Sequence, residues 1–220
     1  MNEQIHVFRT PNHAPVAPRH RAPRPPLSWR DAVPVLTGEH CVLRELEHSD
    51  APQLVQILTM PDVSRFISPP PTSIERFKWF IDWSRGEREA GRYVALALVP
   101  HALGSAAGLL QLRQVEPDFA TAEWGIAISP DYWGAGLFAD ASHLLLDFAF
   151  SEVGVHRLEA RAALANGRVH AAMQKLGAVP EGVLRHSLTT FDGQRHDQVL
   201  WSILDDEWRQ LNAPAVVQVH

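Results

Sequence analysis

The chain has 220 residues, 45% of them hydrophobic, which suits one globular domain with a substantial core. Its formal net charge of −5 argues against a nucleic-acid-binding surface, and no apolar run approaches the roughly 18 residues that a membrane span requires. The single cysteine, Cys41, excludes an internal disulfide and a cysteine metal site, so we expect it to be a small buried hydrophobic residue. An N-terminus without an apolar signal core predicts a cytoplasmic protein.

The N-terminal residues differ in composition from the rest. Residues 1–36 hold seven of the 17 prolines and five arginines against two carboxylates, a charge of +3 that leaves −8 elsewhere. The stretch APVAPRHRAPRPP has neither a helical nor a strand period. We therefore predict a largely flexible arm over 1–36, a domain over 37–210 and a tail over 211–220. Within the arm, Trp29 and Val33 are expected to lie on the domain.

The first half of the domain begins with one predicted strand and two predicted helices. Residues 41–46 have the pattern of a strand, and Ser49 or Asp50 can cap the helix that follows them. A Thr-Ser pair after a triple proline can cap a second helix over 74–89. Three apolar segments then follow in quick succession and predict a meander, at 93–99, 106–113 and 121–128.

The second half predicts two further helices and three further strands. A glycine turn at 134–136 precedes a helix whose apolar residues recur at helical spacing until Gly154 closes it. A strand over 156–163 leads to a short helix over 166–176, which Gly177 ends. The last two strands, at 178–187 and 197–204, are joined by the turn FDGQ. In the order βααβββαβαββ, these elements predict an α/β (α+β) fold, a single domain with one mixed sheet of about seven strands and helices on both faces.

The stretch SPDYWGAGLFAD, residues 129–140, places Gly134 and Gly136 at the expected start of a helix. Unpaired backbone N–H groups and the positive end of a helix dipole suit an anion at such a turn. The spacing also matches the dinucleotide pattern G-x-G-x-x-G/A, but that pattern normally opens the first βαβ unit, and here more than a hundred residues precede it. No Gly-Lys-Ser/Thr follows, which argues against a Walker-type loop. A plain tight turn is the remaining alternative.

A charged residue interrupts the third strand of the predicted meander. In TAEWGIAI, strand alternation puts Glu123 on the opposite face from Ile126. Burying a charge there costs free energy unless the carboxylate has a catalytic role or an ion-pair partner. An ion pair with Arg113 or Arg161 is therefore the alternative to a catalytic role. Glu159, between two arginines of HRLEARAA, is expected to pair with them. The 12 histidines lack the spacing of metal ligands, and we predict no metal site.

Four stretches of the chain match the motifs of one known family in the right order. They are LTGEHCVLRELEHSDAPQL, AEWGIAISPDYWGAGLFADASHLLLDFAF, HRLEARAALANGRVHAAMQKLGAVPEGVLR and DQVLWSIL. Through them, residues 36–208 resemble the GNAT superfamily of acyl-CoA-dependent N-acyltransferases, most closely its RimJ/RimL type, the ribosomal-protein N-terminal acetyltransferases. The resemblance implies a GNAT-like fold and an N-acetyltransferase that moves the acetyl group of acetyl-CoA directly to a primary amine, without a metal or a covalent enzyme intermediate.

The same resemblance implies which residues meet the cofactor and the amine. The glycine turn would hold the pyrophosphate of coenzyme A through the backbone N–H groups of Trp133, Gly134, Ala135, Gly136, Leu137 and Phe138. The pantetheine arm would run beside Ile126, Ala127 and Ile128, and Asn166 would bond to it while also capping a helix. Glu123 matches a carboxylate that relatives use as a base, often through a water molecule.

The chain departs from the family pattern at three positions. Asp131 stands three residues before the first glycine, where an arginine or glutamine is usual, and is expected to turn to solvent. Met173 and Val169 occupy positions at which many relatives carry a tyrosine or serine that protonates the departing thiolate. Because a thiol has a pKa of about 8.5, water is expected to serve instead.

The acceptor amine is predicted from proton affinity. An α-amine, with a reference pKa of about 7.7–8.0, is neutral far more often at pH 7 than a lysine amine at about 10.4, so a weak base suits a protein or peptide N-terminus. The charge of −8 outside the arm is expected to favour a cationic acceptor segment. Alternatives are a small-molecule amine, another acyl donor such as succinyl-CoA, and a non-catalytic acyl-CoA-binding module. Neither nucleic acid nor a membrane is expected as a partner, and a homodimer is left open.

Overall fold

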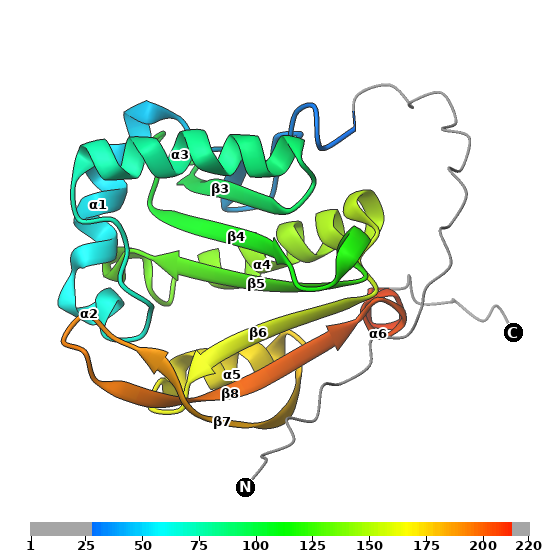
Figure 1. Ribbon diagram of the computed structural model, residues 1–220. Helices are drawn as coiled ribbons and strands as arrows, with labels where there is room; N and C mark the ends of the chain where they lie inside the picture. The colour runs from blue at the N-terminus through cyan, green and yellow to red at the C-terminus, as the bar shows by residue number, and fades with distance from the viewer. Residues whose placement is uncertain (1–27, 213–220) are drawn as a thin grey trace, which may run out of the picture.

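The structure is a computed structural model that describes residues 28–212; the predicted arm up to residue 27 and the tail beyond residue 212 lie outside the described residues (Figure 1). Its strands are β1 (Leu36–Thr37), β2 (Cys41–Glu45), β3 (Tyr93–Pro100), β4 (Gly108–Gln114), β5 (Thr121–Ile128), β6 (Arg157–Ala163), β7 (Val179–Thr189) and β8 (Arg195–Leu204). Its α-helices are α1 (Ala51–Thr59), α2 (Pro61–Ser64), α3 (Ile74–Glu89), α4 (Leu137–Phe148), α5 (Gly167–Lys175) and α6 (Asp205–Leu211). Short 3-10 turns lie at His48–Asp50, Pro117–Phe119 and Pro130–Tyr132, and a π-helical turn at Ala149–Val153.

One eight-stranded sheet runs through the molecule in the order β1-β2-β3-β4-β5-β6-β8-β7. Neighbouring strands pair antiparallel except β5 and β6, which are parallel. The predicted mixed sheet and element order are confirmed, with β1, α2 and α6 as additions. These three elements have two, four and seven residues, too few to show a hydrophobic period in a sequence.

Helices cover the sheet on both faces, as predicted. α1 and α3 lie on one face, over β2 to β4, and α4 and α5 lie behind the other face (Figure 1). On the first face, Phe77 and Ile81 of α3 belong to the same core cluster as Leu109 of β4. On the second face, Leu145 of α4 shares a core cluster with Leu110. β3 is buried along its whole length because both of its faces are covered.

Short-range signals place the helix ends close to the predicted positions. The hydroxyl of Ser73 accepts a hydrogen bond from the N–H of Arg76 at 3.2 Å, which makes it the N-cap of α3. Gly154 and Gly177 follow the helices that they were predicted to end, with φ values of 83° and 86° that favour glycine. Glycine and capping residues therefore mark these boundaries in the sequence itself.

The last residues of the predicted arm pack on the domain. The ring of Trp29 meets that of Phe119 edge to face, with centroids 5.4 Å apart. Val33 and Leu36 are partly buried against the core cluster on the α4 side. The expected contacts of Trp29 and Val33 are confirmed, whereas the limit of the arm at residue 36 stays a prediction.

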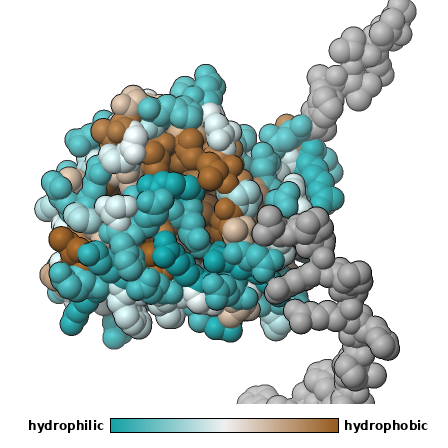
Figure 2. Space-filling view, turned by 90° about the horizontal axis from the view of Figure 1, so that it is seen from above, coloured by the Kyte–Doolittle hydropathy of each residue, from teal (hydrophilic) through white to brown (hydrophobic). Residues whose placement is uncertain are grey.

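The surface seen from above, on the side of α3, has hydrophobic residues near its middle and hydrophilic residues around them (Figure 2). Val35 and Leu103 are among the exposed apolar residues of the molecule. Within residues 28–212, no helix is long and apolar enough to cross a membrane.

The sheet forks between its two parallel strands. β5 and β6 pair only over residues 121–123 and 157–159. Beyond these residues, β5 continues beside β4 as far as Ile128, and β6 continues beside β8 as far as Ala163. The two strands consequently diverge, and the opening between them is visible in Figure 1. Among the described residues, one edge of β5 has no strand partner beyond Glu123, in the middle of the sheet.

Asp140 ties the turn between β1 and β2 to the first turn of α4. Its carboxylate accepts hydrogen bonds from the N–H groups of Glu39, His40 and Cys41 at 3.0, 2.8 and 3.0 Å. Burial raises the pKa of Asp140, but these donors and the Cys41 thiol together hold it below its usual range. Burial, the hydrogen bond to Asp140 and the charge of Asp140 raise the pKa of Cys41 to about 12. Cys41 is fully buried, as expected of a small hydrophobic residue.

Asp140→Asn is expected to lower the free energy of unfolding by about 2 kcal/mol at pH 7, because hydrogen bonds to a charged group are lost. A lowered pKa means that the stabilisation is fully present above the unfolded-state pKa of about 3.9 and is lost as the pH falls through the folded-state pKa. Urea unfolding of the wild type and of Asp140→Asn at pH 7 and near pH 3.5 measures the loss of unfolding free energy at each pH. The exposed Glu152→Gln is the control. An equal loss of unfolding free energy at both pH values would show that the charged Asp140 carboxylate is not the source of the stabilisation.

Candidate active site

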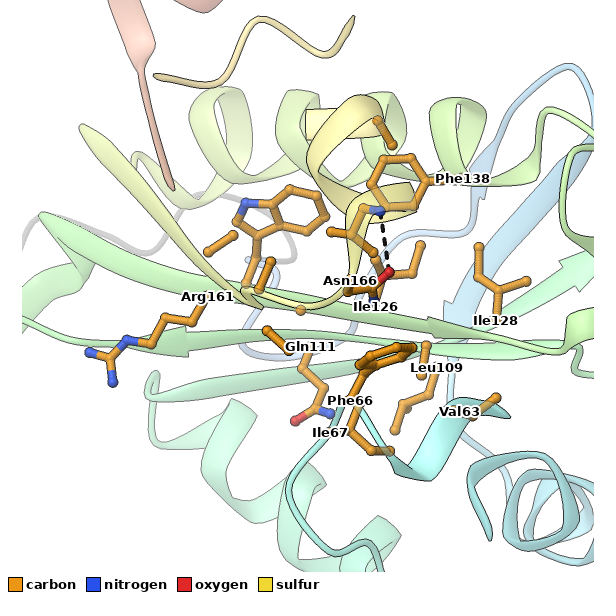
Figure 3. Close-up of a pocket in the computed structure, with 18 of the residues that line it drawn as sticks. Val63, Phe66, Ile67, Leu109, Gln111, Ile126, Ile128, Phe138, Arg161 and Asn166 are labelled. Carbon is orange, nitrogen blue, oxygen red and sulfur yellow. Dashed lines mark hydrogen bonds between the residues drawn. The ribbon is translucent and has the colours of Figure 1, made fainter. Parts of the chain in front are cut away.

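A cavity of about 1250 Å³ occupies the fork of the sheet. Its walls come from β4, β5, β6, the glycine turn, α5, β8 and the segment that follows α2. Arg161 lies at the left of the view in Figure 3 and Val63 at the right, and Gln111, Phe66 and Ile67 lie next to one another between them. Sequence segments that are far apart in the chain thus meet in a single space.

The glycine turn leaves several backbone donors free. Gly134 and Gly136 have φ values of 84° and 79°, and Gly136 is the N-cap of α4. Two of the six residues predicted to bind phosphate use their N–H groups inside the turn: Trp133 donates to Pro130 at 3.1 Å and Ala135 donates to Tyr132 at 3.3 Å. The N–H groups of the other four, Gly134, Gly136, Leu137 and Phe138, have no partner among the described residues. These four donors at a helix N-terminus suit an anion.

The direction of the β5 backbone follows from hydrogen bonds at its two ends. The N–H of Ser129 donates to the carbonyl of Ala107 at 2.8 Å, and the carbonyl of Thr121 accepts from the N–H of Val115 at 2.9 Å. Both groups point toward β4. Because backbone groups alternate along a strand, the odd-numbered residues of β5 face β4 and the even-numbered residues face the fork.

Ile126 and Ile128 therefore direct their backbone groups into the fork. The carbonyl of Ile128 already accepts a hydrogen bond from the indole N–H of Trp133 at 3.0 Å. The N–H and C=O of Ile126 and the N–H of Ile128 have no partner within residues 28–212 and remain for a molecule that lies along this edge. Ala127, the third residue predicted beside the pantetheine arm, points its backbone groups toward β4 instead. The open edge suits an extended chain that adds itself like a strand.

Asn166 stands at the start of α5 and lines the cavity. Its side-chain oxygen accepts a hydrogen bond from the N–H of Val169 at 3.4 Å (Figure 3). The predicted helix cap is thus confirmed. The amide nitrogen of Asn166 remains a donor for a ligand. Arg168 of the same helix lies over the ring of Trp133, 4.0 Å from its centroid, and brings a positive charge to the glycine turn.

The three departures from the family pattern have clear places in the structure. Asp131 is exposed, as expected, and its carboxylate accepts a hydrogen bond from the Ser129 hydroxyl at 3.4 Å. Met173 is 2% exposed and Val169 is partly buried against the core, and both line the cavity. Neither side chain can donate a proton, so this part of the cavity wall supplies none.

Glu123 lies between two arginines at the cavity wall. Its Oε2 atom accepts a hydrogen bond from Nη2 of Arg113 at 2.7 Å and lies 3.5 Å from Nε of Arg161. The side chain of Glu123 is 23% exposed. The ion pair that the sequence offered as an alternative role exists with both arginines at once. Glu159 pairs with Arg157 at 2.9 Å, as expected for one of its two neighbours.

Among the polar residues of the cavity that sequence reasoning missed are Tyr93 and Gln111. The hydroxyl of Tyr93 donates a hydrogen bond to Oε1 of Gln111, and burial raises the pKa of Tyr93. In the sequence, Tyr93 is the first residue of an apolar strand and Gln111 a polar residue inside another. The only local signal is the interruption of an apolar run, which does not by itself indicate a site. No group of three or more potential metal ligands lies together among residues 28–212.

The charges of the cavity wall are opposite in sign to the net charge of the chain. Among the described residues that line it, five side chains are cationic and two are anionic: Arg65, Arg113, Arg161, Arg168, Lys175, Asp62 and Glu123. The acidic excess of the domain therefore lies elsewhere. The expectation that it would draw a cationic acceptor segment to the site is not supported by this distribution.

Known proteins resemble this chain in sequence and in fold. A family model described as "Acetyltransferase (GNAT) domain" matches residues 40–179, more than half of the chain. The chain is 28% identical over 177 residues to "Putative ribosomal N-acetyltransferase YdaF" of Bacillus subtilis (strain 168), over 78% of this chain and 94% of that protein. It is 30% identical over 105 residues to spermidine N(1)-acetyltransferase of Escherichia coli (strain K12), over 48% and 56% of the two chains. The structure of Mycobacterium smegmatis RimJ in complex with CoA-disulfide matches with a TM-score of 0.72 at 20% identity, over 79% and 88%.

The forked sheet, the glycine turn and these matches define a transferase of acyl groups. The chain belongs to the GNAT acetyltransferase family and is an N-acetyltransferase, which confirms the predicted family, fold and enzyme class. Acetyltransferases of this family use acetyl-CoA as the acyl donor. At 20% identity, the likeness to RimJ concerns the fold alone.

Proposed function

We propose that this protein transfers the acetyl group of acetyl-CoA to the α-amine of a protein or peptide. The observation that carries the proposal is the open edge of β5, which ends at a glycine turn with four unpartnered N–H groups. A linear arm that carries phosphates at one end fits this sequence of sites. The N–H groups of the turn would bind the pyrophosphate, Ile126 and Ile128 would bond to the arm, and Asn166 would donate to it.

The acyl group would lie where β5 and β6 separate, and the amine would attack it there. Backbone donors that point into the fork would stabilise the negative charge that develops on the acyl oxygen. We assign the base to Glu123, acting through water, because it lies at the cavity wall and is the last residue of β5 that pairs with β6, directly before the open part of the strand. With Met173 and Val169 in the usual donor positions, water protonates the thiolate, whose reference pKa is about 8.5.

Two observations favour an α-amine over the polyamine that one relative is named for. An α-amine, with a reference pKa of about 7.7–8.0, loses its proton to a weak base more readily than an alkylamine at about 10.4. The cavity wall also carries more cationic than anionic side chains, which disfavours a polycation. A relative that matches over 78% of this chain is named "Putative ribosomal N-acetyltransferase YdaF", which is consistent with a protein acceptor.

Acetylation of matched peptides tests this function. Peptides with a free N-terminus are expected to be acetylated, with a kcat/KM that rises with pH to an apparent pKa near 8. Peptides with a blocked N-terminus are expected to be inert even when they contain lysine. Thiol release from acetyl-CoA and from succinyl-CoA measures the rate and the choice of acyl donor. Efficient acetylation of a lysine in a blocked peptide would overturn the proposal. Binding of acetyl-CoA without release of its thiol in the presence of any amine would favour a non-catalytic module.

A further inference from the structure

Arginine outnumbers carboxylate at the part of the cavity that is nearest to Glu123. Arg113 of β4 and Arg161 of β6 both reach the same oxygen of Glu123, at 2.7 and 3.5 Å. A single carboxylate balances only one guanidinium, so the cluster keeps positive charge in excess. The side chains of Arg113 and Arg161 are 53% and 38% exposed, and each guanidinium has five N–H donors. Donors therefore remain on both arginines for another carboxylate.

Gly125 opens a path to the fork beside this cluster. It follows Glu123 by two residues, so it lies on the same face of β5, about 7 Å further along the strand. A Cβ atom added at Gly125 would meet no heavy atom within 4 Å. An amine can consequently approach β5 at Gly125 from the face that bears Glu123.

The residue opposite Gly125 also offers hydrogen-bond donors. Gln111 of β4 is the register partner of Gly125, and its Oε1 accepts from the hydroxyl of Tyr93. Its amide nitrogen is left for the cavity. Phe66 and Ile67 lie next to Gln111 and add apolar surface to the cavity wall (Figure 3). The surroundings of Gly125 thus combine donors and apolar surface.

We propose that the acceptor carries a carboxylate close to its amine and that Arg113 and Arg161 bind this carboxylate. The inference rests on the proposed function and narrows its substrate class. Guanidinium groups bind carboxylates through paired N–H donors. The spacing of about 7 Å along β5 between Glu123, which both arginines contact, and Gly125 corresponds to about two residues of extended peptide. The carboxylate therefore belongs to an acidic side chain at the first or second residue, or to the C-terminus of a very short peptide.

Four matched acceptors test the proposal in steady-state assays with acetyl-CoA. They are N-terminally free pentapeptide amides with Asp, Asn or Lys as the second residue, and the free acid of dialanine. The Asp peptide is expected to exceed the Asn peptide about tenfold in kcat/KM, mainly through KM, and the Lys peptide to be the poorest. If dialanine is used as well as the Asp peptide, the carboxylate is the C-terminus of a short acceptor. If dialanine is not acetylated, the carboxylate belongs to an acidic side chain.

Variants of the cluster separate this role from folding. Arg161→Gln is expected to raise the KM for the Asp peptide to that of the Asn peptide, and Arg161→Glu to make the Lys peptide the preferred one. Arg185→Gln removes an exposed arginine that does not line the cavity and is expected to change nothing. Arg113→Gln supplies a second test if the Arg161 variants do not fold. Equal use of all three pentapeptides by wild type, with no better use of dialanine, would overturn the inference and leave the proposed function intact, whereas failure of every free N-terminus would overturn both.

Discussion

Gly134→Glu is expected to weaken the binding of acetyl-CoA by about 100-fold or more while the protein stays folded. Gly134 lines the cavity at the glycine turn, and a Cβ atom added there would meet no heavy atom within 4 Å. The new carboxylate would therefore occupy the space that the free N–H groups face. Two like charges about 4 Å apart near a protein surface repel by about 4 kcal/mol, which is more than 100-fold in a dissociation constant.

Gly134→Ala is the matched control for this variant. The φ value of 84° at Gly134 strains any residue with a Cβ atom by about 1–2 kcal/mol, and both variants share that cost. Calorimetric titration with acetyl-CoA then isolates the effect of the charge. Gly136→Glu is a less clean test, because its Cβ atom would lie 3.1 Å from the ring of His40. Equal affinities of the Gly134→Glu and Gly134→Ala variants would place the phosphate site elsewhere.

Glu123→Gln is expected to lower kcat by about 100-fold at pH 7 and to leave the affinity for acetyl-CoA unchanged. A general base contributes about 10²- to 10⁴-fold, and a base that acts through water lies at the lower end. The difference in kcat between wild type and Glu123→Gln should become smaller as the pH rises above 8, because a larger share of the amine is then already neutral. Steady-state kinetics from pH 6.5 to pH 9.5, with thermal melting of each variant, measures both effects.

A purely structural role of Glu123 in its ion pairs is the alternative to its role as a base, and the variant Arg113→Gln distinguishes the two. This variant breaks the hydrogen bond of 2.7 Å between Arg113 and Glu123 but keeps the carboxylate. If Glu123 is the base, Arg113→Gln changes KM more than kcat, whereas Glu123→Gln changes kcat. If Glu123 has only a structural role, both variants lower the melting temperature by a similar amount, and the folded Glu123→Gln variant keeps its kcat.

Much of this architecture is encoded in short-range patterns. Glycines that adopt positive φ, the capping residues Ser73 and Asn166, and the alternation of β5 depend on a residue and its near neighbours. Anion binding at the glycine turn could likewise be predicted from the sequence, because the free N–H groups of the turn follow from the local start of a helix. These features hold wherever the segment is placed in space.

Other features depend on contacts between distant segments. Asp140 binds the backbone of Glu39 and His40, about a hundred residues earlier, and nothing in either stretch indicates the partner. The cavity wall of Tyr93, Gln111 and Phe66 forms because three separate segments meet. Glu123 could be assigned to an ion pair or to catalysis from its sequence, but its simultaneous contact with Arg113 and Arg161 requires the register of three strands.

The sequence by itself determined the order of elements, the ends of most helices, the glycine turn and the candidate base, because each depends on periodicity, capping or backbone conformation over a few residues. The tertiary structure alone decided where the sheet forks, which four of the six turn residues keep a free N–H group, and which sign of charge faces the acceptor. The fork exists because β5 stays with β4 and β6 stays with β8, a competition between strand pairings that no single segment contains.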